Sequence, residues 1–148
     1  MKKRCINRLS CTLPAISQNE SVARSLVAAF VSLPDPTIEE LADLRCAVSE
    51  AVTNAVVHAY RGKEGEVYIS VKLYDDRSVR VEVRDRGVGI TDIEEARRPL
   101  FTTDKSGERS GMGFAVMEAF TDKLRVFSRV GYGTRVVMEK RLKKTEDG

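Results

Sequence analysis

Two hydrophobic periods divide the chain, and the first of them is helical. From Leu41 to Ala59, apolar residues recur every three or four positions, which places them on one face of an α-helix. The motif TIEE at residues 37–40 precedes this run and has the form of a capping box, in which two side chains satisfy the first backbone N–H groups of a helix. A second such motif, SQNE at residues 17–20, predicts another helix that reaches about Phe30.

The second period is two residues. Apolar and polar residues alternate over residues 67–73 and again over residues 79–83, with a turn at 75–78 between them. Such alternation predicts an antiparallel sheet with one buried face, covered by helices on that side only. The remaining strands are expected at 6–13, 124–129 and 134–140, and the remaining helices near 93–98 and at 113–121. The predicted fold class is a two-layer α/β sandwich.

Length and charge restrict the class of protein. The 148 residues amount to about one domain, so we treat 1–148 as a single domain. Lysine and arginine number 25 against 22 aspartates and glutamates, and the net charge of +3 falls well below the basic excess typical of nucleic-acid-binding proteins. The longest near-apolar stretch, residues 25–33, is far shorter than the ~20 residues that span a bilayer. We therefore expect no direct nucleic-acid partner and no membrane anchor.

Cysteine usage indicates a reducing compartment. The three cysteines include no C-x-x-C pair, and the chain has only one histidine. Neither a disulfide framework nor a zinc site is therefore expected, and the protein is predicted to be cytoplasmic. We interpret His58 as a packed or capping residue, because no nucleophile stands near it in the sequence.

The second predicted helix carries one isolated carboxylate. Between Cys46 and Tyr60 the only formal charge is Glu50, and Asn54 lies four residues later on the same helical face. The positions opposite the apolar stripe, where a solvated helix carries charge, are Ala47, Thr53 and Val57. This half of the helix should be covered on nearly all sides. Either Glu50 is paired with an arginine and Asn54 with backbone, or the two oxygens face a pocket where they suit Mg²⁺ and a reacting hydroxyl.

Two glycine motifs stand where a ligand can approach the backbone. Asp85, Gly87 and Gly89 follow the second hairpin strand, and this aspartate can accept a hydrogen bond from an amino group such as that of adenine. Gly111 and Gly113 precede a predicted helix, whose N-terminal N–H groups attract phosphates. Each motif alone is usually a turn. Neither is a Walker loop, and neither completes a G-x-G-x-x-[GA] fingerprint, which argues against a Rossmann fold.

The polar connection between these motifs is long enough to be a lid or a binding segment. Arg109 lies at its end, directly before the second glycine motif, where phosphate charge would sit. We interpret Arg97 and Arg98 as part of a solvated charge run, and Gly131 and Gly133 as turn residues.

In their order along the chain, these motifs resemble the N, G1 and G2 boxes of the GHKL ATPase/kinase superfamily. Further segments resemble the anti-sigma F factors of sporulating bacteria, so that the similarity covers nearly the whole chain. These segments are 17–21, 49–55, 98–103 and 108–114. The resemblance implies the Bergerat-type ATP-binding fold, with a mixed, mostly antiparallel sheet and helices on one face.

The resemblance also implies an activity. The protein would bind ATP and Mg²⁺, form a homodimer, hold a sporulation sigma factor inactive, and act as a protein serine/threonine kinase on a serine of an anti-anti-sigma protein. A stress-response anti-sigma kinase of the same family, and a non-catalytic module that uses ATP only to sequester a protein, remain as alternatives.

Residue roles follow from the same resemblance. Glu50 would be the general base, Asn54 the Mg²⁺ ligand and Asp85 the adenine contact. The glycines Gly87 and Gly89 would shape the base pocket. The remaining nucleotide contacts would be Arg109, Gly111 and Gly113 around the phosphates and Thr134 on the adenine side. The partner contacts would be Glu20 and Arg24, exposed on the first helix.

Overall fold

A five-stranded sheet forms one layer of the molecule in the computed structural model, which describes residues 2–98 and 113–143. Its strands lie in the order β1-β2-β3-β5-β4, and every neighbouring pair among these described strands is antiparallel. The strands are β1 (Cys5–Pro14), β2 (Glu66–Tyr74), β3 (Ser78–Asp85), β4 (Lys123–Arg129) and β5 (Gly133–Arg141). All five predicted strands are confirmed to within about two residues at each end.

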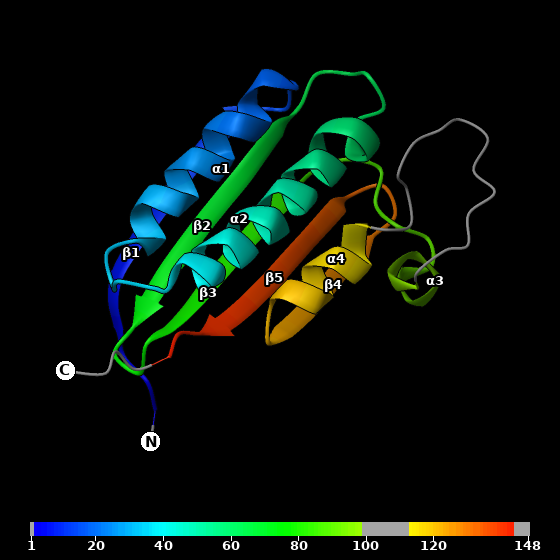
Figure 1. The fold of residues 1–148 in the computed structure, drawn as a ribbon. Helices are drawn as coiled ribbons and strands as arrows, with labels where there is room; N and C mark the ends of the chain where they lie inside the picture. Colours follow the sequence, from blue (N-terminus) through cyan, green and yellow to red (C-terminus); the bar gives the residue numbers. More distant parts are fainter. Residues whose placement is uncertain (1, 99–112, 144–148) are drawn as a thin grey trace.

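The helices lie on one face of this sheet, as the alternating pattern predicts (Figure 1). They are α1 (Gln18–Val31), α2 (Ile38–Thr53) with its continuation η1 (Asn54–Ala59), α3 (Ile93–Arg97) and α4 (Gly113–Phe120). Helix α2 runs across the middle of the sheet between α1 and α4 and contacts both of them. The two-layer α/β sandwich is therefore confirmed.

The core lies between the two layers. Inward-facing valines and isoleucine of the central strands, such as Ile69, Val71 and Val81, are at most 2% exposed, and they pack against Val48 and Val52 of α2. Burying each such side chain stabilises the fold by roughly 1.5–3 kcal/mol relative to exposure. The alternation of apolar and polar residues along the strands therefore identifies the side chains that face the helices.

The capping box at the start of α2 is confirmed. Thr37 Oγ1 accepts a hydrogen bond from the backbone N–H of Glu40 at 3.0 Å, and Glu40 Oε1 accepts one from the Thr37 N–H at 2.9 Å. The second carboxylate oxygen of Glu40 accepts from the N–H of Lys143 at 2.8 Å, just beyond β5. Because of these hydrogen bonds, the pKa of Glu40 is lowered although burial opposes the change. One side chain therefore joins the beginning of α2 to the end of β5.

The capping box predicted at the start of α1 is wrong. Ser17 adopts helical backbone angles, φ −59° and ψ −33°, and its side chain makes no capping hydrogen bond. The carboxylate of Glu20, which would complete the box, instead accepts a hydrogen bond from Ser49 Oγ at 2.9 Å. This contact between α1 and α2 takes the carboxylate away from its own N-terminus, so that packing overrides the local motif.

The long second helix changes its hydrogen-bonding pattern near its end. Residues 54–59 form the π-helix η1, in which backbone hydrogen bonds run from i to i+5. The carbonyl of Ala59 at its end accepts a hydrogen bond from the N–H of Val88 at 2.8 Å. The π-helix therefore ends against the loop that follows β3, and it begins at Asn54, one of the predicted functional residues.

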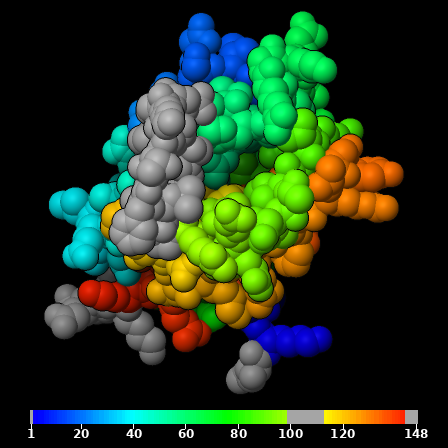
Figure 2. All heavy atoms as spheres, turned by 90° about the vertical axis from the view of Figure 1, so that its right-hand side faces the viewer, coloured from blue at the N-terminus to red at the C-terminus, as the bar shows by residue number. Residues whose placement is uncertain are grey.

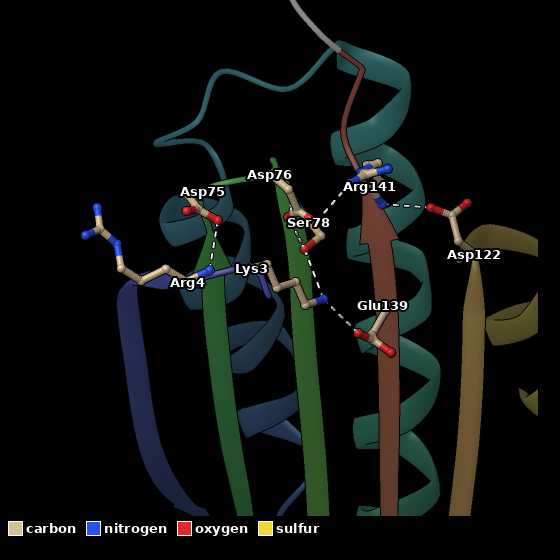
Figure 3. A network of polar contacts seen from close by, with 8 residues as sticks. All are labelled: Lys3, Arg4, Asp75, Asp76, Ser78, Asp122, Glu139 and Arg141. Atoms are coloured by element: carbon tan, nitrogen blue, oxygen red, sulfur yellow. Dashed lines mark hydrogen bonds and ion pairs between the residues drawn. The ribbon is translucent and has the colours of Figure 1, made fainter. Parts of the chain in front are cut away.

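Charged side chains join the strands at the other end of the sheet (Figure 3). Asp76, in the turn between β2 and β3, accepts hydrogen bonds from Ser78 Oγ at 2.5 Å and from Arg141 at 3.0 Å. Lys3 lies beside Ser78 and forms an ion pair with Glu139 at 3.2 Å. The Ser78 hydroxyl, more than any other contact, lowers the pKa of Asp76 to about 2. Contacts between side chains thus hold the segment before β1, the β2–β3 turn and β5 together.

No helix within residues 2–98 and 113–143 is both long enough and apolar enough to cross a membrane.

Candidate functional site

A cavity of about 300 Å³ opens between η1, the loop after β3, the start of β5 and the start of α4. Figure 2 looks onto this side of the molecule, with the green segment of α3 in front. Most of the wall is apolar, and it includes Ala51, Val83, Ile90, Phe114 and Val136. Polar groups enter it at a few points. A flat ring with an apolar face and a small number of hydrogen-bonding groups fits such a space.

Three predicted residues meet on the side of the cavity formed by α2 and α4. A Cβ atom built on Gly113 would lie 3.3 Å from the side-chain nitrogen and oxygen of Asn54 and 3.4 Å from Glu50 Oε2. The N-terminus of α4 therefore approaches the helical face that carries the isolated carboxylate, so that three residues from two separate motifs lie side by side. A larger residue than glycine would press against the side chains of both Asn54 and Glu50.

The covered environment predicted for this part of the helix is also present. From Cys46 to Tyr60, only Val57 is exposed, with 44% of its surface accessible. Glu50 is half-buried and has a contact of its own in the structure. A carboxylate in such surroundings interacts more strongly with a nearby charge than it would in water, because less solvent screens it.

Asp85 provides a buried carboxylate at the cavity wall. The residue is 8% exposed, and its Oδ1 accepts hydrogen bonds from the N–H groups of Gly87 at 2.9 Å and Thr134 at 3.2 Å. Burial raises the pKa of Asp85, against the lowering effect of these two hydrogen bonds. Both hydrogen bonds from the described residues use the same oxygen, so the carboxylate retains acceptor capacity for a donor inside the cavity.

The two glycines after Asp85 allow the loop to approach its neighbours. A Cβ at Gly87 would collide with the carbonyl oxygen of Ala59 at the end of η1, so this close contact requires glycine. Gly89 has φ +80°, a left-handed conformation that other residues rarely adopt, and it lies against the backbone of Arg129. The motif is therefore a turn, and it also forms part of the cavity wall.

Thr134 lines the cavity as predicted, and it belongs to a hydrogen-bonded set that sequence reasoning missed. Ser128 Oγ accepts from the N–H of Ile90 at 2.7 Å, donates to the Gly133 carbonyl at 3.1 Å, and lies 2.8 Å from Thr134 Oγ1. Gly133, interpreted as a turn residue only, also packs against the backbone of Asp85, where a Cβ would collide. The β4–β5 register that creates these contacts has no local signal in the sequence.

In the sequence analysis, His58 was also given no place in the candidate site. It lines the cavity one helical turn after Asn54, besides being packed into η1. The spacing of four residues between these two side chains was available as a signal, because positions i and i+4 share a helix face.

The remaining predicted residues divide into two groups. Arg109 and Gly111 lie outside the described residues. Arg98 is exposed, as expected for a solvated charge run, whereas Arg97 is partly buried and forms an ion pair with Glu118 of α4 at 3.1 Å.

Glu20 and Arg24 differ from the expectation that both are exposed. Their side chains are 25% and 35% exposed and form an ion pair with each other at 3.5 Å. Since α1 packs against α2, Glu20 also bonds to Ser49, and the buried Nε of Arg24 has no hydrogen-bond partner among the residues that the structure describes. These side chains present only part of their polar atoms at the surface.

The donor set fits a magnesium ion held jointly with phosphates. Within the described part of the chain, no cluster of three or more His, Cys, Asp or Glu residues could hold a metal ion. The oxygen of Asn54, beside the carboxylate of Glu50 and the N-terminus of α4, matches the usual arrangement in which one or two protein oxygens and substrate phosphates share Mg²⁺.

Comparison with known proteins agrees with this architecture. Residues 13–140 match the family model described as a histidine kinase-like ATPase domain. Anti-sigma F factors from Bacillus thuringiensis and Bacillus mycoides are each 50% identical to this chain over 137 residues, which cover 92% of the chain and 93% of each relative.

Solved structures with lower identity share the fold. The RsbU and RsbW domains of a Mycobacterium tuberculosis protein superimpose with a TM-score of 0.70 at 24% identity, over 94% of this chain and 33% of that one. Full-length ShkA in complex with AMPPNP gives a TM-score of 0.57 at 19% identity, over 98% of this chain and 32% of that one.

Proposed function

The chain belongs to the anti-sigma F factor family of histidine kinase-like ATPase domains, and from this premise we propose that it is a protein serine kinase that also holds a sporulation sigma factor inactive. The observation that carries the proposal is the meeting of Glu50, Asn54 and Gly113 beside an apolar cavity with Asp85 in its wall. A module that only sequesters a protein has no need for a carboxylate at the position of Glu50.

In this proposal the adenine ring of ATP occupies the apolar cavity and donates a hydrogen bond from its amino group to Asp85. Gly87 and Gly89 keep the loop close enough to shape the ring pocket, and Thr134 contacts the adenine side. The phosphates extend toward Gly113, where the N-terminus of α4 favours negative charge. Arg109 and Gly111, which lie outside the described residues, are assigned to the same phosphates.

Phosphoryl transfer requires little more of the protein than positioning and charge stabilisation. Glu50 accepts the proton of the partner's serine hydroxyl as the serine oxygen forms its bond to the γ-phosphorus. The bond from that phosphorus to the bridging oxygen breaks, and ADP leaves with the electron pair. The Asn54 oxygen would hold Mg²⁺ together with the phosphates, and the ion would supply positive charge to offset the negative charge of the leaving group.

The partners follow from the family. We assign the sigma factor and the anti-anti-sigma protein as partners, the second being the phosphorylation substrate, with the kinase acting as a homodimer. The partly exposed pair Glu20 and Arg24 on α1 is assigned to protein contacts.

A transfer assay with γ-labelled ATP, Mg²⁺ and the anti-anti-sigma protein tests the function. The wild-type chain should label one serine of the partner, identified by mass spectrometry. Glu50→Gln should lower the rate at least ~100-fold, the usual contribution of a positioned general base. Calorimetry should find its ATP affinity within about twofold of wild type, because the amide keeps the shape of the carboxylate.

Glu39→Gln is the matched control, since Glu39 is an exposed carboxylate in the first turn of the same helix. It should leave the rate of transfer unchanged. A Glu50→Gln protein with the wild-type rate would exclude the base role. If the wild-type protein binds the sigma factor in the presence of ATP but transfers no label to the anti-anti-sigma protein, the protein would instead be a sequestering module.

A further inference from the structure

The sheet face without helices carries an open groove of about 500 Å³ at the β4–β5 end of the sheet. Cross-strand neighbours run in a row across it, from Tyr68 of β2 through Arg84 of β3 and Arg135 of β5 to Phe127 of β4. Arg86, Arg129 and Tyr132 extend the same surface into the adjoining loops. In Figure 2 the orange segment around residue 130 projects on the right, away from the cyan start of α2 on the left.

The arginines of this groove lie over aromatic rings. The guanidinium carbons of Arg84 and Arg86 are 4.8 Å and 5.0 Å from the centre of the Tyr68 ring. Arg129 lies 4.3 Å from the centre of the Tyr132 ring, and Arg135 lies 4.4 Å from that of Phe127. Stacking of this kind orders a guanidinium and directs its N–H groups outward, ready to bind an oxyanion at two points.

Most of this positive charge has no counter-ion in the part of the chain that the structure describes. Arg135 is 3.3 Å from Glu82, whereas Arg84, Arg86 and Arg129 have no ion pair with any carboxylate of residues 2–98 and 113–143. All three are exposed. The net charge of the whole chain is only +3, so this groove concentrates more positive charge than the average surface.

We propose that this arginine groove is a docking site for an acidic segment of a partner protein, rich in aspartate and glutamate. Carboxylates match the two-point donor geometry of the stacked guanidinium groups. A single-stranded nucleic acid fits less well, since it binds by stacking bases on open aromatic faces and by following a long basic track. Here guanidinium groups already occupy ring faces, and four arginines surround a short groove.

The groove adjoins the candidate nucleotide site through a shared wall. Asp85 and Thr134 line both the groove and the apolar cavity on the helix side. A segment bound in the groove therefore lies one strand thickness away from the adenine pocket. Binding at this docking site requires no kinase activity, so its test is independent of the test of the proposed phosphoryl transfer.

Fluorescence anisotropy with a fluorescein-labelled octaglutamate peptide and the full chain tests the proposal. Wild-type protein should bind the peptide, more weakly as salt increases, because exposed charge pairs are screened. Arg129→Glu should weaken binding about tenfold or more, as expected for the loss of one charged hydrogen bond and the addition of a repulsive charge. Arg84→Gln, which is uncharged and retains polarity, should weaken it in the same direction.

Arg45→Glu is the matched control, because Arg45 is exposed on α2 and the substitution changes the net charge by the same amount. It should keep binding within about twofold of wild type, and circular dichroism should find all three variants folded. Equal weakening by Arg45→Glu, absence of peptide binding, or tighter binding of labelled oligothymidylate that Arg129→Glu abolishes would each overturn the proposal.

Discussion

At the scale of single residues, Asp85 combines a position in the wall of the candidate site with a cost in stability. Burial raises the pKa of this carboxyl above its ordinary value, so the ionised form destabilises the folded state above that pKa. The cost is present at neutral pH and disappears as the pH falls below the ordinary value of 3.8, where the group is protonated in both states. The folded protein therefore keeps an ionised carboxylate at a position where burial disfavours the charge.

Asp85→Asn should therefore stabilise the protein and abolish nucleotide binding. The amide oxygen can keep the hydrogen bonds from Gly87 and Thr134, while the buried charge is removed. At pH 7 the free energy of unfolding in urea should increase by ~1 kcal/mol, the usual range for relieving a functional constraint. The gain should diminish toward pH 4, and calorimetry should detect no ATP binding.

The control for this substitution is Asp35→Asn. Asp35 is exposed, and its φ of 60° suits asparagine equally well. It should change neither the stability nor ATP affinity. Loss of stability in Asp85→Asn would mean that the carboxylate charge is compensated in the folded protein.

Residues with a strong local reason for their type were the ones that could be predicted. Glu50 was conspicuous because no other charge shares its half of the helix, and Gly87 because it belongs to a D-x-G-x-G motif directly after a predicted strand. Ser128 was missed, since a serine in a strand has no distinctive pattern and its role depends on which residues the register places opposite it.

At the scale of elements, the two capping motifs carry the same residue types and reach different outcomes. In α2 the box forms, and Glu40 additionally bonds to the end of β5. In α1 the glutamate is drawn to Ser49 of the neighbouring helix. A motif of four residues can predict that a helix begins, but the capping contacts themselves depend on what packs nearby.

Thr37→Ala and Ser17→Ala test this difference as a matched pair. Thr37→Ala removes a formed cap and should lower the free energy of unfolding by ~1 kcal/mol. Ser17→Ala removes a hydroxyl without a capping bond and should change it by less than ~0.5 kcal/mol. Urea denaturation of both variants measures the two values. Equal losses would contradict the assignment of the caps.

The π-helix could not be predicted from the hydrophobic pattern. Apolar residues continue at helical spacing through Ala55 and Ala59, whether the hydrogen bonds run to i+4 or i+5. The additional residue per turn is accommodated where η1 meets the loop after β3, and π-helical segments occur often at functional sites. The strands were easier to predict, because the alternation of apolar and polar residues shows directly which face of each strand is buried.

At the scale of the whole molecule, the candidate site lies at one end of the sheet and a set of charged contacts lies at the other. The cavity and the arginine groove adjoin Asp85 at one end of β3, while Asp76 and its partners hold the turn before the other end (Figure 3). Helix α2 crosses the sheet within the helical layer, and its continuation η1 begins with Asn54 at the end that holds the cavity. Asp76 and its partners can thus be altered without changing a residue of the candidate site.

Asp76→Asn should make the stability of the folded protein less sensitive to a decrease in pH. The pKa of Asp76 is about 2, below the ordinary value of 3.8, so its ionised form stabilises the folded state above 3.8 and this contribution is lost as the pH falls toward 2. The variant should be less stable than wild type at pH 7, and the difference should shrink between pH 4 and pH 2. Thermal unfolding monitored by circular dichroism across this range measures both.

Asp75→Asn is the control in the same turn. Asp75 accepts a hydrogen bond from the N–H of Arg4 at 2.8 Å, which an amide oxygen can also accept. It should leave the slope of stability against pH as in wild type, and ATP affinity should be unchanged in both variants. An unaltered slope in Asp76→Asn would assign the acid sensitivity to other carboxylates.

The contact between η1 and the loop after β3 gives the candidate nucleotide site a spectroscopic reporter of its own. The Val88 N–H points to the carbonyl of Ala59, so it is protected from solvent only while the end of the π-helix and the glycine loop remain together. Hydrogen exchange at this single amide measures how often the cavity wall opens. A ligand in the cavity would be detected as slower exchange there, without a label on any side chain that binds it.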